Sequence, residues 1–281
     1  MQLSEHAPAK INLALHVRRR REDGYHDLET LFAFTAFGDT LRAAPADRLT
    51  LAVDGEFTVP SGAGDENLVL RAARMLAAAT GIRAGAALSL TKRIPVAAGL
   101  GGGSADAAAA LRLLDRLWGT GCSPQQLTEL AAELGADVPA CVRSQTCFAT
   151  GKGESMTPVD AHVAGLPVLL LNPRIAVPTG PVFAAWDGVD RGPLNPAHDL
   201  RTLRNDLTAP AVGLVPAIGT MLGWLAGRDG VVLARMTGSG GSVFGLFGDM
   251  ASAAAAARAV PAEWWSVYTQ LRRPGGDGGP Q

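Results

Sequence analysis

Four glycines within the five residues Gly99–Gly103 constrain this sequence more than any other feature. They belong to the segment Pro95–Ser104, which lies between a run typical of a strand, Ala87–Leu90, and a run typical of a helix, Ser104–Trp118. Glycine loses more conformational freedom on folding than other residues, so such a cluster is costly unless the backbone needs it. Glycines permit positive φ and close approach of a ligand, and the following helix offers unpaired N–H groups to an anion. The segment therefore predicts a phosphate-binding loop.

Two common nucleotide-binding patterns do not fit this loop. A Rossmann fingerprint needs G-x-G-x-x-G, whereas Gly99-x-Gly101 is followed by Ser104. A Walker A loop needs G-x-x-x-x-G-K-[ST], but the Gly-Lys pair at 151–152 is followed by glycine and lacks the first glycine of the pattern. From the loop alone, a glycine-rich turn without a ligand remains the alternative to a phosphate site.

Composition excludes several other classes of protein. A chain of 281 residues with 47% hydrophobic and 18% charged residues is long enough for two globular domains. A net charge of -1 argues against nucleic acid as a main partner, because such proteins usually carry a strongly basic face. Cys122, Cys141 and Cys147 form no C-x-x-C pair, so we expect small buried residues rather than disulfides or metal ligands. The N-terminus lacks a signal-peptide pattern, and no apolar run reaches the roughly 20 residues that span a membrane, so we expect a cytoplasmic protein.

Hydrophobic periodicity predicts strands and helices that intermix in both halves, which is typical of the α+β class. From Lys10 to Val17 apolar and polar residues alternate, which predicts a half-buried strand with Lys10 and Asn12 on its polar face. A change in composition places the domain boundary near residue 155, giving domains 1–155 and 156–281. The further predictions are strands near 31–37, 49–53, 167–171, 231–236 and 243–247, helices near 67–79, 124–134, 181–186, 211–226 and 249–259, N-caps at Ser104 and Ser123, and a frayed end at Pro274–Gln281.

The loop P-x-x-x-G-L-G-G-G-S resembles the second motif of the galactokinase, homoserine kinase, mevalonate kinase and phosphomevalonate kinase superfamily, the GHMP kinases. This resemblance implies that the backbone amides of Gly99–Ser104 hold the phosphates of ATP. It also implies that the Ser104 hydroxyl helps to place Mg²⁺, whose other ligands are unknown. Lys92 and Asn67 would lie near the adenosine, and Ala105 stands where many members have a second serine. The implied ATP-binding set is Asn67, Lys92, Pro95, Val96, Ala97, Ala98, Gly99, Leu100, Gly101, Gly102, Gly103, Ser104 and Ala105.

Lys10 and Asp137 are far apart in the sequence, and each alone is consistent with a surface lysine or a helix-capping aspartate. Lys10 lies in P-A-K-I-N-L, and Asp137 lies in G-A-D-V-P. Both strings resemble signatures of one GHMP family, the 4-diphosphocytidyl-2-C-methyl-D-erythritol kinases. The resemblance implies that Asp137 accepts the proton of the acceptor hydroxyl. Lys10 would keep Asp137 ionised and stabilise charge on the transferred phosphoryl group.

The string D-G-Y-H-x-L-x-T-x-F ends at Phe32 and contains Tyr25 and His26. On physical grounds it is a turn followed by an aromatic ring and an imidazole, which could bind a flat base or simply pack the turn. It resembles the cytidine-recognition motif of the same family. By that resemblance Tyr25 stacks on cytosine, His26 reads its polar edge and Phe32 supports both. Three further substrate contacts are implied at Thr179, Phe183 and Asn12, with Gly180 a departure from the family pattern.

A third motif, M-T-G-S-G-G-S at 236–242, also resembles the superfamily, with Gly241 and Ser242 where alanine and cysteine are common. The resemblance runs from Ala7 to Phe247. It implies a two-domain α+β GHMP kinase fold, with a ribosomal protein S5 domain 2-like N-terminal domain and a ferredoxin-like C-terminal domain.

The activity implied is ATP-dependent phosphorylation of the 2-hydroxyl of 4-diphosphocytidyl-2-C-methyl-D-erythritol in the non-mevalonate isoprenoid precursor pathway. The partner would be this small molecule rather than nucleic acid or membrane, and the expected state is a monomer or a weak homodimer. Two alternatives stay open at this point. One is another kinase of the superfamily, acting on homoserine or mevalonate. The other is a nucleotide-binding regulator without turnover.

Overall fold

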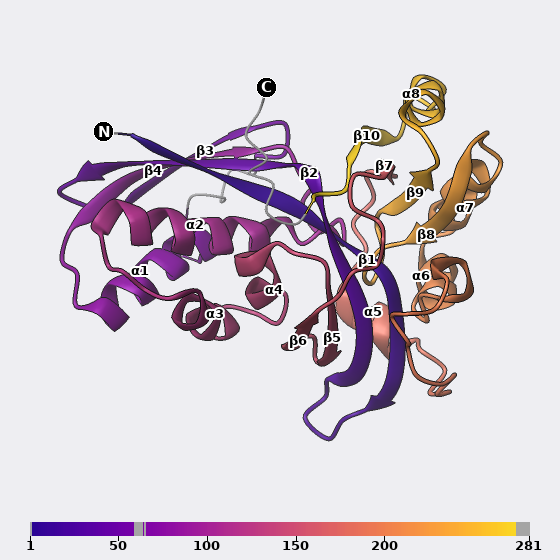
Figure 1. Ribbon diagram of the computed structural model, residues 1–281, viewed down its shortest axis with the longest axis horizontal. Helices are drawn as coiled ribbons and strands as arrows, with labels where there is room; N and C mark the ends of the chain where they lie inside the picture. Colours follow the sequence, from indigo (N-terminus) through magenta and orange to yellow (C-terminus); the bar gives the residue numbers. More distant parts are fainter. Residues whose placement is uncertain (1, 59–63, 65, 274–281) are drawn as a thin grey trace.

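The computed structural model describes residues 2–58, 64 and 66–273 of the chain. Strands and helices intermix along it, which confirms the α+β class (Figure 1). The strands are β1 (Leu3–Arg20), β2 (His26–Ala46), β3 (Thr50–Gly55), β4 (Gly85–Lys92), β5 (Cys147–Gly151), β6 (Ser155–Pro158), β7 (Pro167–Asn172), β8 (Val231–Met236), β9 (Val243–Phe247) and β10 (Trp265–Gln270). The helices are α1 (Leu68–Thr80), α2 (Gly102–Trp118), α3 (Pro124–Ala132), α4 (Val138–Arg143), α5 (Thr179–Ala184), α6 (Thr208–Leu214), α7 (Ala217–Ala226) and α8 (Met250–Arg258), with a 3₁₀ turn at Leu200–Thr202.

Two sheets organise these elements. The first has six strands in the order β3-β4-β2-β5-β6 with β1 paired to β2, and the second has four in the order β10-β7-β9-β8. Helices α1 to α4 lie together along one face of the first sheet (Figure 1). Strand β7 alternates between two cores: Leu169 and Leu171 pack with apolar residues of α6, α7 and α8, whereas Val168 and Leu170 pack toward β1 and β2.

Strands β1 and β2 are much longer than the runs expected from periodicity, and they join the two halves of the molecule (Figure 1). Leu15 of β1 forms a bridge with Asn205, and Thr35 of β2 forms a bridge with Leu271 near the end of the described chain. The expected division near residue 155 falls at β6, the last strand of the first sheet, and it stays a proposal.

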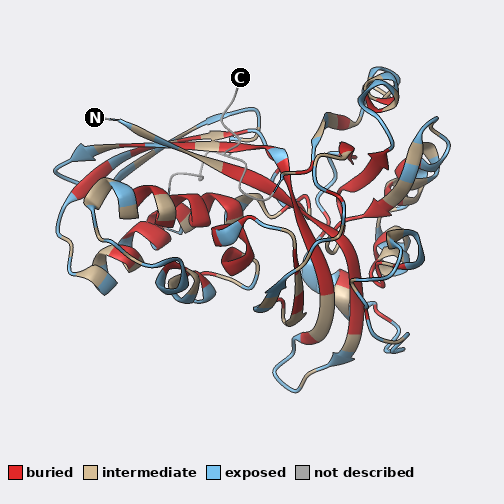
Figure 2. Cartoon of the chain, in the orientation of Figure 1, coloured by how far each residue is buried: buried red, intermediate tan, exposed pale blue. Residues whose placement is uncertain are grey.

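The expectation of a half-buried strand at 10–17 is wrong. The whole run from Ala7 to Val17 is buried, including Lys10 at 3% and Asn12 at 2% exposure, and Figure 2 shows this as continuous red along the middle of β1. The cause is the position of β1 between the two halves, since Ile11 contributes to the core between the sheets while polar groups of the other half cover the opposite face. Buried polar groups need hydrogen-bond partners, so Lys10 and Asn12 are expected to be paired within the protein.

Helix boundaries follow local rules, with one correction. Helix α1 starts after Asn67, whose side chain accepts from the Val69 amide, and α3 has the complete capping box expected at Ser123. Ser104 is not the N-cap of α2: the cap is Gly101, in the left-handed region with φ 65°, and Ser104 lies in the first turn. Glycine adopts this backbone conformation without steric cost, so the helix begins earlier and its first amides lie beside the loop.

The second half contains the three expected strands, a fourth strand, β10, that was not predicted, and one helix that differs from expectation. Strands at 167–171, 231–236 and 243–247 are confirmed, while the single helix expected at 211–226 is two helices, α6 and α7. The break falls at Pro216, which has no N–H to continue α6 and suits the start of α7. Cys141 and Cys147 are buried, as expected, whereas Cys122 is only partly buried. No helix in the described part of the chain is long and apolar enough to cross a membrane. The expected frayed end at Pro274–Gln281 lies outside the described residues.

Candidate active site

Two pockets adjoin along the glycine-rich loop. The larger has a volume of about 700 Å³ and the smaller about 360 Å³, and Gly99, Gly101 and Ser104 line both. Most of the other sequence-predicted residues line one pocket or the other. The larger pocket is lined by Lys10, Asn12, Tyr25, His26, Phe32, Asp137, Thr179 and Phe183, and the smaller by Asn67, Lys92, Pro95, Val96, Ala97, Ala98, Gly102 and Gly103.

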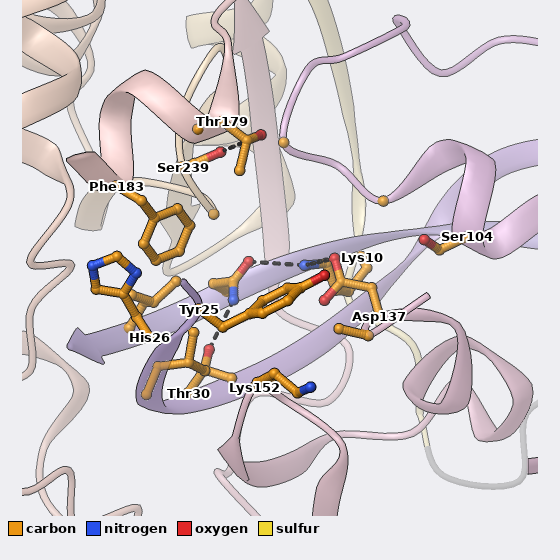
Figure 3. A pocket seen from close by; sticks show the side chains of 18 of the residues that line it. Lys10, Tyr25, His26, Thr30, Ser104, Asp137, Lys152, Thr179, Phe183 and Ser239 are labelled. Atoms are coloured by element: carbon orange, nitrogen blue, oxygen red, sulfur yellow. Dashed lines mark hydrogen bonds and ion pairs between the residues drawn. The ribbon is translucent and has the colours of Figure 1, made fainter. Parts of the chain in front are cut away.

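Lys10 and Asp137 meet on the floor of the larger pocket (Figure 3). The Lys10 Nζ lies 2.9 Å from Asp137 Oδ2 and donates a second hydrogen bond, 3.1 Å long, to Asn12 Oδ1. The Lys10 side chain is 4% exposed, whereas that of Asp137 is 38% exposed. Asp137 precedes α4 without capping it through its side chain. A carboxylate that is open to the pocket and held by a buried ammonium can accept a proton from a bound hydroxyl.

The Asn12 side chain has a fixed orientation. Its Nδ2 donates to Thr30 Oγ1 at 2.8 Å, and the Thr30 hydroxyl donates to the Ala14 carbonyl at 2.7 Å. Because the Thr30 hydroxyl uses its proton on Ala14, it can only accept from Asn12, which turns Asn12 Oδ1 toward Lys10. Thr30 was part of the recognised string but no role was expected for it.

Irregularities in β1 connect this strand to both glycine-rich segments. The pairing of β1 with β2 shifts register next to Lys10 and again next to Asn12. The Lys10 amide donates to the Leu100 carbonyl at 2.9 Å, and the Asn12 amide donates to Thr237 Oγ1 at 2.9 Å. The Thr237 hydroxyl also lies 3.3 Å from the Gly99 carbonyl. Such bulges re-aim backbone groups, and here they bind the loop and the third motif to the strand that carries Lys10.

The two glycine-rich segments touch backbone to backbone. Gly99 has φ 74°, and a Cβ there would lie 2.5 Å from the Gly240 carbonyl oxygen. Gly101 has φ 65°, and a Cβ there would lie 3.2 Å from the Lys10 Cβ and Cε. This close backbone approach brings the third motif against the loop.

Aromatic side chains form the far end of the larger pocket (Figure 3). Tyr25 is 58% exposed, and the Lys152 Nζ lies 4.6 Å from the centre of its ring. His26 is buried against Phe183 at 5.0 Å and Trp186 at 5.7 Å between ring centres. Burial, and secondarily the charge of Arg20, lowers the pKa of His26, so the imidazole is neutral near pH 7.

The His26 Nε2 is a buried polar atom without a hydrogen-bond partner among the described residues. Buried polar atoms are usually paired, so this nitrogen is available to bind a ligand. In the same pocket, the Thr179 hydroxyl lies 3.0 Å from that of Ser239. Phe32 lies apart from this end, because its ring is under the Lys10 ammonium at 4.6 Å from the ring centre. Leu100 and Ala105 are buried beneath the loop and line neither pocket.

The smaller pocket contains a buried cluster of charges. Lys92 pairs with Asp39, and its Nζ lies 2.6 Å from Asp106 Oδ2. Burial raises the pKa of Asp106 to about 8, the nearby Asp39 adds to this, and Lys92 opposes it. Lys92 was expected near the adenosine and does line this pocket, but its ammonium is engaged by both carboxylates. Asp39 was missed, and the available signal was a carboxylate within the run from Leu31 to Leu41, whose other residues are apolar or small.

Comparison with known proteins agrees with this arrangement. Residues 67–145 match the GHMP kinases N terminal domain, and residues 191–266 match the GHMP kinases C terminal domain. The chain is 53% identical to the 4-diphosphocytidyl-2-C-methyl-D-erythritol kinase of Rhizorhabdus wittichii, covering 97% of this chain and 96% of that one. It is 50% identical to the enzyme of the same name from Novosphingobium aromaticivorans, covering 97% and 94%.

Solved structures show the same relationship at the level of the fold. A crystal structure of 4-(cytidine 5'-diphospho)-2C-methyl-D-erythritol kinase superposes with a TM-score of 0.84 at 36% identity, covering 96% of this chain and 100% of that one. Homoserine kinase from Cytophaga hutchinsonii superposes with a TM-score of 0.69 at 15% identity, covering 97% and 96%, which is a likeness of fold alone. The two-part GHMP kinase fold expected from the sequence is confirmed.

Proposed function

The chain belongs to the 4-diphosphocytidyl-2-C-methyl-D-erythritol kinases within the GHMP kinases, and we propose that it carries out their reaction at the Lys10–Asp137 pair. It is a small-molecule kinase that uses ATP. The reaction moves the γ-phosphoryl group of ATP to the 2-hydroxyl of 4-diphosphocytidyl-2-C-methyl-D-erythritol, a step in isoprenoid precursor biosynthesis. The acceptor occupies the larger pocket, and the nucleotide occupies the smaller one.

The transfer needs one proton acceptor and compensation of negative charge. The acceptor oxygen forms a bond to the γ-phosphorus, the bond from that phosphorus to the bridging oxygen of ADP breaks, and the hydroxyl proton passes to Asp137. Lys10, held by Asp137 and Asn12, lies where it stabilises negative charge on the transferred group. Most of the catalytic effect comes from aligning the acceptor hydroxyl with the γ-phosphoryl group, because the protein forms no covalent bond during the transfer.

The loop supplies the phosphate contacts of the donor. The backbone amides of Gly99–Ser104 run into the N-terminus of α2, where unpaired N–H groups and the helix dipole favour an anion. Bound Mg²⁺ would neutralise charge on the phosphates. No group of three or more His, Cys, Asp or Glu residues in the described chain could form a metal cage. Such a donor set fits a cation held mainly by nucleotide phosphates, with the Ser104 hydroxyl as the protein ligand.

The aromatic end selects the cytidine group. Tyr25 offers an exposed ring for stacking, and Phe183 with Thr179 lies across the pocket from it. A neutral His26 with a free Nε2 can donate to or accept from the edge of the base, depending on its tautomer. The base is thus recognised at one end of the pocket, and phosphoryl transfer takes place at Asp137, away from that end.

The observation that carries the proposal is that Lys10 and Asp137 form an ion pair between the phosphate loop and the aromatic end of one pocket. A coupled assay of ADP release with 4-diphosphocytidyl-2-C-methyl-D-erythritol tests it, with the uridine analogue and homoserine as controls. We expect turnover with the cytidine compound and little with either control. Turnover with homoserine instead would identify another GHMP activity, and binding of both substrates without ADP release would identify a regulator.

We also propose a cellular location and an oligomeric state for the whole protein. It acts in the cytoplasm as a monomer or weak homodimer, on a small molecule rather than on nucleic acid. Light scattering across a range of protein concentrations measures the oligomeric state.

A further inference from the structure

Asp39 of β2 is a completely buried carboxylate beneath the glycine-rich loop. Its Oδ1 accepts hydrogen bonds from the backbone amides of Arg93, at 2.5 Å, and Ile94, at 2.8 Å. Its Oδ2 pairs with the Lys92 ammonium. These three partners are consecutive residues at the point where β4 ends and the loop begins. The Asp39 side chain therefore binds all three residues at the start of the loop.

Lys92 also connects Asp39 to the helix that follows the loop. Its Nζ lies 2.6 Å from Asp106 Oδ2, in α2. The loop connects Lys92, at the end of β4, to Asp106 in α2. A Cβ added to Gly102 would lie 3.4 Å from the Lys92 Nζ. The ammonium is thus packed against the first residue of the helix. Asp39 and Lys92 together tie the strand before the loop to the helix after it.

Stability alone does not account for such a group. Burying a carboxylate and an ammonium carries a large desolvation cost, and replacing buried ion pairs by apolar residues is often neutral or stabilising. The cluster is also placed at a functional position, since both Lys92 and Asp106 line the smaller pocket beside the loop. Loop amides that bind phosphates must be held in place before the ligand arrives, because ordering them on binding lowers affinity.

We propose that Asp39 is a positioning residue for ATP: through the Arg93 and Ile94 amides and the Lys92–Asp106 link, it sets the position of the phosphate-binding loop. Asp39 itself does not touch the nucleotide. The inference rests on the proposed function in one respect, namely that the loop binds the phosphates of ATP. It predicts that damage at Asp39 weakens binding of nucleotide selectively and leaves the cytidine end of the other pocket unaffected.

Asp39→Asn is the informative substitution, because it keeps one oxygen for the backbone amides and removes the charge that faces Lys92. We expect the KM for ATP, and the Kd of a non-hydrolysable ATP analogue measured by calorimetry, to rise about tenfold, while the KM for the acceptor stays within about twofold. Asp206→Asn is the matched control. Asp206 is also buried and accepts from a backbone amide, Val17 N at 2.9 Å, and from a cationic side chain, Arg204 Nε at 2.7 Å, but it lies away from the loop.

The outcomes separate positioning from general destabilisation. Both variants can lower the melting temperature, but only Asp39→Asn should weaken binding of the analogue. If Asp39→Asn binds the analogue as tightly as the wild type, or weakens both substrates equally as a loss of stability would, the inference is wrong. If Asp39→Asn does not fold, Asp106→Ala breaks the same link at the helix, and unchanged binding of the analogue by that variant overturns the inference.

Failure of the proposed function would look different. A wild-type protein that binds the ATP analogue but releases no ADP with the cytidine substrate refutes the activity. The comparison between Asp39→Asn and Asp206→Asn then remains valid, because it is read from binding and needs no turnover.

Discussion

The Lys10 ammonium lies 2.9 Å from the Asp137 carboxylate although the two residues are 127 positions apart in the chain. The pair joins β1, which runs through both halves of the molecule, to the residue that precedes α4. The same strand donates its Lys10 amide to the phosphate loop. One strand therefore brings together the proposed proton acceptor, the cation beside it and the glycine-rich loop.

Asp137→Asn removes the proposed proton acceptor and keeps the shape of the side chain. We expect kcat to fall about 10²- to 10⁴-fold, the usual contribution of a general base, while the KM for ATP changes little. Steady-state ADP release measures both constants. Asp249→Asn is the control, since Asp249 is also an N-cap residue but lies at α8 in the second half. A variant at 137 with nearly full kcat would remove Asp137 from the mechanism.

Thr30→Val leaves the Asn12 amide without its acceptor and frees the Asn12 side chain to turn away from Lys10. We expect kcat to fall about tenfold, consistent with an unsatisfied buried polar group, and Thr30→Ser to restore it. Thr35→Val is the control, because Thr35 is equally buried on β2 and donates to the Phe37 carbonyl, but has no bond to the site. Equal losses of kcat in the two valine variants would contradict a specific role for Thr30.

Tyr25→Ala removes the exposed ring at the far end of the pocket. We expect the KM for the cytidine substrate to rise about tenfold or more, in the range of one base–aromatic stack, with no change in the KM for ATP. Tyr25→Phe keeps the ring and should behave as the wild type. The other tyrosine, Tyr268 on β10, is 47% exposed and provides the matched alanine control. An unchanged acceptor KM in Tyr25→Ala would exclude stacking at this position.

Gly99→Ala tests the contact between the two glycine-rich segments. The new Cβ would lie 2.5 Å from the Gly240 carbonyl oxygen, so the loop must move and kcat/KM for ATP should fall at least about tenfold. Gly81→Ala has almost the same backbone angle, φ 71° against 74°, with nothing within 4 Å of the added Cβ. It should cost about 1 kcal/mol of stability without loss of activity. Similar kinetics in both variants would show that backbone strain alone, rather than the contact, is responsible.

Asp106 predicts an unusual dependence of stability on pH. Burial raises its pKa from 3.8 to about 8, so the folded protein binds a proton that the unfolded chain has lost across this range. Stability therefore decreases as pH rises through that window. Lys92, the cation that faces Asp106, has a raised pKa and stays charged throughout.

Asp106→Asn cannot bind this proton, so the free energy of unfolding of the variant should increase relative to the wild type from about pH 5 to about pH 8. Urea denaturation at several pH values measures it. A difference between the two proteins that stays constant with pH would contradict the raised pKa.

Short-range features were predictable because they depend on a few neighbouring residues. The N-cap at Ser123 and three strands of the second sheet, β7, β8 and β9, follow from local hydrogen bonding and periodicity, whereas β10 was not predicted. The error at Ser104, which was expected to be an N-cap, arose because Gly101 adopts a backbone conformation that a serine disfavours, and only the path of the loop shows this. The break at Pro216 divides a run whose spacing predicted one helix, because proline lacks the N–H that would continue α6.

Contacts that depend on packing were not predictable from pattern. Alternation at 10–17 indicated a polar face in solvent, yet Lys10 and Asn12 are buried because the second half covers them. The roles inferred here for Thr30, Asp39 and Thr237 depend on partners brought near by sheet register and by bulges in β1, which no local signal encodes.

The chemistry of the separate parts could be inferred from sequence alone: a loop of glycines suited to phosphates, a lysine and an aspartate within family-like strings, and a turn with an aromatic ring suited to a base. Folding establishes which of these parts meet, that Asp137 faces the pocket while Lys10 is buried, and that Asp39 binds the start of the loop and, through Lys92, is linked to the helix after it. Local sequence cannot encode these contacts because turn and helix preferences act over a few residues. The positions of β1 against α4, and of β2 beneath the loop, follow from burying apolar surface across the whole chain.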